Sequence, residues 1–193
     1  MKLSRIAFPL FLVLAAVQLA VPASMIWSRE QTLQQGTAFK FRTGAVDPYD
    51  IFRGRYVTLR FEERTAPWRD TTPPRSGLTV YATIAEGADG FARFSGATTA
   101  RPAEGAYLKM RVWRPQAGQQ TVQLDVPFDR YYLEESLAPA AEAAYRRHSR
   151  GEKRNAYVVL RVRAGQGVLE ELYVAGQPIL EAIAADAEDP PGS

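Results

Sequence analysis

Residues 46–63, VDPYDIFRGRYVTLRFEE, combine the local signals of a short helix, a glycine turn and a strand. Asp47 before Pro48 is typical of a helix N-terminus, where a carboxylate caps free amides and proline suits the first helical position. Asp50 falls in the first turn, where a negative charge is favoured. Gly54 supplies the left-handed residue that commonly ends a helix. We therefore predict one turn of helix that ends at the glycine and is followed directly by a strand.

The second half of this stretch predicts a half-buried strand. Val57, Leu59 and Phe61 alternate with polar residues, and a period of two indicates a strand with one apolar face. The opposite face carries Tyr56 and Arg60. The same alternation recurs along the chain, so we predict a mainly β fold of the α+β type. The further strands are expected over residues 37–42, 78–85, 91–95, 106–113, 121–126, 156–163 and 168–174.

The spacing of these segments predicts an antiparallel sandwich or a partly open barrel over residues 37–183, preceded by a single transmembrane helix. One covering helix is expected between Ser136, its cap, and Gly151, because the basic residues before the glycine suit a helix C-terminus. Residues 64–77 are rich in proline and charge and predict a long surface loop. Residues 184–193 are acidic and contain prolines, and we expect a disordered tail there.

The N-terminus carries the pattern of a membrane span. Lys2 and Arg5 precede an uncharged run over residues 6–27. At about 1.5 Å per helical residue, this run matches a hydrocarbon core of roughly 30 Å. The positive flank predicts a cytoplasmic N-terminus and an exported domain.

Two interpretations of this segment stay open. Residues 1–27 are an uncleaved anchor followed by a polar spacer, residues 28–36, that is able to continue the helix, or they are a signal peptide cleaved after Ala23. The apolar run continues past that cleavage site to Trp27, which favours the anchor. Both interpretations export the domain.

Residues 54–61, Gly-Arg-Tyr-Val-Thr-Leu-Arg-Phe, resemble the motif of the Gly-Asp-Tyr-x-x-Leu-x-Tyr family of membrane-anchored bacterial proteins. Residues 47–50, Asp-Pro-Tyr-Asp, and residues 130–133, Arg-Tyr-Tyr-Leu, also match the layout of that family. Arg55 stands where the family has Asp, which reverses a charge, and Phe61 stands where it has Tyr, which keeps an aromatic ring. The resemblance implies a single-pass protein of the bacterial inner membrane with its C-terminal domain in the periplasm. It implies no established activity.

No set of residues in the sequence identifies a catalytic or metal site. The chain lacks cysteine, and His148 is its one histidine, so thiolate and two-histidine metal sites are excluded. Neither a phosphate-binding glycine loop nor a nucleophile elbow occurs, and we expect no cofactor and no metal. The formal net charge is +3, of which Lys2 and Arg5 contribute two. The nearly neutral remainder gives no indication of nucleic-acid binding.

Aromatic and basic side chains share the non-apolar side of three predicted strands. If these strands are neighbours, they form one face that suits a sugar, an anionic polymer, a lipid headgroup or an acidic patch on a partner. Six residues are the candidates for binding: Tyr56, Arg60, Tyr107, Arg111, Trp113 and Arg161. Lys109, Tyr157 and Arg163 lie on the same side of their strands.

Three functions are consistent with the sequence. The first is a non-enzymatic interaction module of the cell envelope, anchored through residues 6–27 and acting with an inner-membrane protein partner. The second is a module that binds a glycan or a lipid headgroup through the aromatic and basic face. The third is an envelope hydrolase whose carboxylates are brought together by folding, since their separation in space cannot be read from sequence.

Overall fold

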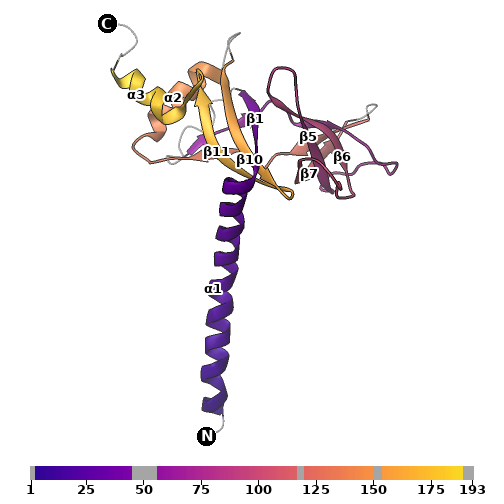
Figure 1. Ribbon diagram of the computed structural model, residues 1–193, viewed down its shortest axis with the longest axis vertical. Coiled ribbons are helices and arrows are strands. Elements are labelled where there is room, and N and C mark those ends of the chain that lie inside the picture. Colours follow the sequence, from indigo (N-terminus) through magenta and orange to yellow (C-terminus); the bar gives the residue numbers. More distant parts are fainter. Residues whose placement is uncertain (1–2, 45–55, 117–119, 150–153, 189–193) are drawn as a thin grey trace.

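The computed structural model describes residues 3–44, 56–116, 120–149 and 154–188. The expected helical turn, with Asp47, Pro48, Asp50 and Gly54, lies outside these residues. Two β-sheets, a short two-stranded ribbon and two helices build the domain, and a long N-terminal helix projects from it as a stalk (Figure 1).

The stalk is helix α1, which runs without a break from Leu3 to Gln35. The predicted polar spacer is helical as far as Gln35, so the predicted anchor and the spacer form one helix. Within the described residues, Phe8–Gln35 is the stretch long and apolar enough to cross a membrane, and its apolar window is not buried in the domain. A helix of this kind near the N-terminus is compatible with a signal anchor or a signal sequence.

The first sheet has the strand order β12-β11-β10-β1-β3, with every neighbouring pair antiparallel. Its centre is the predicted hairpin of β10 and β11, which pairs with the predicted first strand, β1. Ala164 and Gly165 both have positive φ values in the hairpin turn, as a tight two-residue turn requires. The strands are β1 (Thr37–Gly44), β3 (Arg60–Phe61), β10 (Ala156–Arg163), β11 (Gln166–Val174) and β12 (Gln177–Pro178).

The second sheet has the order β4-β8-β7-β5-β6 and curls into a nearly closed barrel. Its two edge strands meet where Trp68 forms a parallel bridge with Ala97 and the Arg69 amide donates to the Ala97 carbonyl at 3.0 Å. The expectation of a β-rich fold with a partly open barrel is therefore confirmed. The strands are β4 (Thr65–Pro67), β5 (Thr79–Glu86), β6 (Ala92–Thr98), β7 (Tyr107–Pro115) and β8 (Thr121–Asp125).

Strand β4 corrects the prediction that residues 64–77 form only a loop. Three residues are too few for a recognisable alternation, and the prolines around them indicate a loop. The strand nevertheless forms because β8 offers an open edge, on which Ala66 faces Val122. Ala66 is fully buried there.

Two short helices pack together against the first sheet: α2 (Ala138–Ser149) and α3 (Ile179–Glu188). The predicted helix is thus α2, although it starts two residues after Ser136, whose hydroxyl donates to Glu134 instead of capping amides. Helix α3 enters the segment expected to be a disordered tail, so residues 184–188 correct that expectation. Burial of Ile179 and Ile183 explains why this segment folds.

One apolar core runs through both sheets. Val57, Leu59 and Phe61 are buried, as their alternation predicted. Phe41 on β1 lies between Phe61 of the first sheet and Phe94 of the barrel, with ring centroids 5.6 Å and 5.5 Å away. The two sheets therefore share a packed interior and hold a fixed relation to each other.

Candidate interaction surface beside the stalk

The two segments that carried the family resemblance pair with each other. Strand β2 (Tyr56–Thr58) and strand β9 (Arg130–Tyr132) form a short antiparallel ribbon, called the motif ribbon below. Tyr56 faces Tyr132, and Val57 faces Tyr131. The Leu59 amide extends the pairing by donating to the Asp129 carbonyl at 2.8 Å. Segments more than seventy residues apart in the sequence thus form one structural unit.

The outer side of the motif ribbon carries a cluster of Tyr56, Arg130 and Tyr132. The two tyrosine rings meet edge to face with centroids 5.6 Å apart. The Arg130 guanidinium lies 5.0 Å from the centre of the Tyr56 ring, a cation–π contact. Tyr132 is 65% exposed. This Tyr–Arg–Tyr cluster therefore presents two rings and one positive charge to the surroundings.

The inner side of the motif ribbon ties it to the first sheet. The Tyr131 hydroxyl donates to Glu171 Oε1 at 2.6 Å, and the Leu172 amide donates to the same oxygen at 3.0 Å. Burial raises the pKa of the Tyr131 hydroxyl well above its usual value, and the Glu171 carboxylate adds to this shift. The phenol is thus held in its protonated, hydrogen-bond-donating form.

This pKa shift gives the protein a specific response to alkaline pH. A raised pKa in the folded state adds stability that is complete below the unfolded-state pKa of about 10 and is lost as the pH rises toward the folded-state value. We expect the stability of wild type to fall more steeply above about pH 10 than that of Tyr131→Phe, measured as denaturation midpoints against pH. Tyr132→Phe, altered on the exposed side of the same strand, is the control and should keep the wild-type slope. Equal slopes for wild type and Tyr131→Phe would contradict the assignment.

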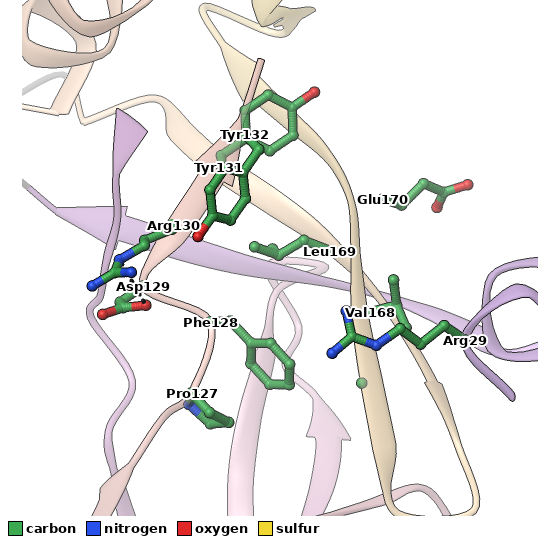
Figure 2. Close-up of a pocket in the computed structure, with 11 residues that line it drawn as sticks. Arg29, Pro127, Phe128, Asp129, Arg130, Tyr131, Tyr132, Val168, Leu169 and Glu170 are labelled. Carbon is green, nitrogen blue, oxygen red and sulfur yellow. Dashed lines mark ion pairs between the residues drawn. The ribbon is translucent and has the colours of Figure 1, made fainter. Parts of the chain in front are cut away.

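A cavity of about 570 Å³ opens between the motif ribbon, β11 and the stalk. Figure 2 shows Arg29 reaching from α1 past Val168 toward Phe128, with Tyr131 and Tyr132 at the far end. A second cavity of about 530 Å³ adjoins it and shares five of its lining residues. We call the two together the junction groove, which is lined by Ser24, Met25, Ser28, Arg29, Leu108, Lys109, Pro127, Phe128, Asp129, Arg130, Tyr131, Tyr132, Gly165, Gln166, Gly167, Val168, Leu169 and Glu170.

The stalk is seated on the domain by polar contacts with the β10–β11 hairpin. Ser28 Oγ donates to Gln166 Oε1 at 2.7 Å, and Arg163 Nη1 donates to Gln31 Oε1 at 3.2 Å. Arg161 Nη1 donates to the Gly36 carbonyl, directly after the helix ends. These contacts fix the direction in which the domain faces relative to α1.

The six residues predicted to bind do not form one face, because their strands belong to three different sheets. Tyr56 lies on the motif ribbon and Arg60 on β3. Arg111 and Trp113 lie on the barrel strand β7, where the exposed Trp113 ring packs against the Arg114 guanidinium at 4.0 Å.

The remaining two candidates have structural partners. Tyr107 is 7% exposed, and its hydroxyl accepts a hydrogen bond from Arg101 Nε at 2.5 Å. Arg161 lies on β10, forms an ion pair with Glu170 at 2.7 Å and holds the end of the stalk. Two arginines that were not among these candidates line the junction groove: Arg29 from α1, and Arg130 from β9, which the sequence singled out only as part of the family layout.

The residues that the structure describes form no arrangement that identifies a reaction. Within the described ranges, no three histidine or acidic residues gather where a metal ion could be held. Two acids line the junction groove, and each has an arginine partner. Asp129 lies 4.0 Å from Arg130, and Glu170 forms the close pair with Arg161. The groove and the Tyr–Arg–Tyr cluster bring aromatic rings and positive charge together.

Comparison with known proteins identifies the family of the chain. No curated protein and no solved structure matches the chain. The model of the GDYXXLXY protein family matches residues 18–172, a span that includes the second half of the stalk, both strands of the motif ribbon and the whole barrel. The chain belongs to the GDYXXLXY protein family.

Proposed function

We propose that the protein is a membrane-anchored, non-enzymatic interaction module whose motif ribbon contacts a protein embedded in the same membrane. In this proposal α1 is an uncleaved anchor with residues 6–27 in the bacterial inner membrane. The domain lies in the periplasm, as the positive charges of Lys2 and Arg5 before the apolar run favour.

The observation that carries the proposal is the seating of the stalk. Because the hairpin contacts Ser28 and Gln31, directly beyond the apolar run, the domain is held close to the membrane surface in one orientation. A tether of this kind raises the effective concentration of any partner in the same membrane without requiring a new contact. A fixed orientation also lowers the entropy lost on association.

The chemistry of the Tyr–Arg–Tyr cluster suits a protein partner. Tyrosine and arginine are over-represented among the residues that dominate protein–protein binding energies, because they combine large contact area with hydrogen-bonding groups. Tyr132 leaves most of its ring exposed. Tyr56 supports it from the opposite strand, so the ring is positioned before any partner arrives.

The test is site-specific photo-crosslinking in intact cells that carry the full chain. With the crosslinker p-benzoylphenylalanine in place of Tyr132, we expect an adduct with an integral membrane protein that stays in the membrane after alkaline washing. The same crosslinker in place of Trp113, an exposed ring on the barrel, is the matched control and should give no such adduct. We expect Tyr56→Ala with Tyr132→Ala to reduce co-purification of this protein at least ten-fold, since hot-spot residues contribute about 2 kcal/mol or more each.

Three results would contradict the proposal. Recovery of the mature domain in the soluble periplasmic fraction would show that the leader is a cleaved signal peptide. Equal adducts from both crosslinker positions, or co-purification that the double variant leaves unchanged, would remove the motif ribbon as the contact surface.

A further inference from the structure

We infer that the junction groove binds an anionic phospholipid from the periplasmic leaflet of the membrane. The inference rests on the proposed anchoring of α1 and adds a ligand class for the groove. It concerns the cavity around Arg29 and Lys109, which neither Arg130 nor Tyr132 of the Tyr–Arg–Tyr cluster lines.

The position of the groove along α1 is the first argument. Met25 and Ser28 of the stalk line it, and the apolar run of α1 ends between them at Trp27. In an anchored chain, this level is the boundary between the acyl chains and the headgroups. An occupant of the groove therefore meets hydrocarbon on one side and water on the other.

The charge of the groove is the second argument. Arg29 comes from α1 and Lys109 from β7, so two separate elements bring positive charge to one cavity. Within the described part of the chain, neither side chain has an ion-pair partner. Figure 2 shows the Arg29 guanidinium directed toward Phe128, across the groove. The acids of the groove, Asp129 and Glu170, line its first cavity, and each is paired with an arginine.

The apolar lining is the third argument. Met25, Phe128 and Val168 surround the same cavity as the two cations. Gly167 lets Phe128 and Leu108 pack directly against β11, because a Cβ atom there would lie 2.6 Å from Phe128 Cζ and 2.9 Å from Leu108 Cδ2. A volume of about 530 Å³ is in the range of pockets that hold a small ligand. Unpaired cations beside apolar side chains at this depth match a phosphodiester with its glycerol and first methylenes.

The experiment uses the full chain in nanodiscs of phosphatidylcholine that contain phosphatidylglycerol as the minor component. Native mass spectrometry after release from the disc counts the lipids that stay bound. We expect selective retention of phosphatidylglycerol by wild type. The variants Arg29→Gln and Lys109→Gln should each lower its retention about five-fold, the scale of one basic residue at an anionic surface.

A charge-matched control separates this effect from net charge. Arg146→Gln removes one positive charge from α2, on the side of the domain away from the stalk's N-terminus, and should retain phosphatidylglycerol as wild type does (Figure 1). Thermal unfolding of each variant in detergent verifies that the fold is intact.

The outcomes distinguish this inference from the proposed function. A chain that enters the nanodiscs but retains the two lipids in the proportion in which the disc contains them overturns lipid recognition and leaves the anchor in place. Retention of as much phosphatidylglycerol by Arg29→Gln and by Lys109→Gln as by wild type has the same meaning. Displacement of the lipid by millimolar inorganic phosphate would assign the groove to a free phosphate and would overturn the inference as well. A chain that does not enter the nanodiscs overturns both the anchor and the inference.

Discussion

Phe41→Ala is expected to lower the free energy of unfolding by about 3–5 kcal/mol, the usual cost of removing a buried phenylalanine ring. Phe41 is fully buried and contacts an aromatic ring in each sheet, Phe61 and Phe94. Its removal leaves a cavity at the place where the two sheets meet. Because both sheets rely on this ring, we expect a single unfolding transition at a lower denaturant concentration. Tryptophan fluorescence during a denaturant titration measures this transition.

Phe91→Ala is the matched control for this prediction. Phe91 is also a phenylalanine, but it is only partly buried and packs against the Arg42 guanidinium at 3.7 Å on the surface. Its loss should cost about 1 kcal/mol, the scale of a surface cation–π contact. Similar losses for the two variants, or two separate transitions for Phe41→Ala, would contradict the idea of one shared core.

The second large effect is expected for Gly165→Ala, at about 2–4 kcal/mol. Gly165 has a φ of +86°, where an L-residue with a side chain is strained by about 1 kcal/mol. A Cβ atom would in addition lie 2.9 Å from Tyr107 Cε2, and overpacking of this kind costs about 1–3 kcal/mol. The buried Tyr107 ring cannot move easily, because Arg101 holds its hydroxyl.

Gly176→Ala measures the backbone part of this effect alone, so its difference from Gly165→Ala gives the steric part. Gly176 has nearly the same φ, +83°, in a second turn, and nothing lies within 4 Å of a Cβ atom placed there. We expect a loss of about 1 kcal/mol, measured by the same denaturant titration. Equal losses at the two glycines would show that Tyr107 adapts and that the hairpin tip is not packed tightly against the barrel.

Most of the longer strands were predictable because each carries its own evidence, whereas the short strands β9 and β12 were not expected. The two-residue spacing of Val57, Leu59 and Phe61 is enough to predict a half-buried strand. The same spacing predicts the strands of the β10–β11 hairpin. Strand order was not predictable, since it depends on contacts between distant segments. Strand β4 was missed because three residues contain no period, and α3 because its two buried isoleucines make a weaker pattern than the acidic residues that follow.

The candidate site was predictable only in part, for the same reason. The alternation of side chains along a strand shows on which side Tyr107 or Arg161 lies. It does not show which sheet the strand joins or what covers that side. Arg161 became a structural residue because the bulge in the hairpin brings Glu170 within reach. Tyr132 belongs to the family layout, but its exposure depends on the pairing of β9 with β2, which the sequence does not show.

The firm seat of the stalk has a mechanical consequence. If α1 is anchored as proposed, its apolar run of about 22 residues is about 33 Å long, slightly more than a hydrocarbon core of roughly 30 Å. A helix takes up such a mismatch by tilting, and thinner bilayers demand a larger tilt. Because the hairpin grips Ser28 and Gln31, the domain tilts with the helix. Bilayer thickness thereby sets the angle at which Tyr132 is presented along the membrane surface.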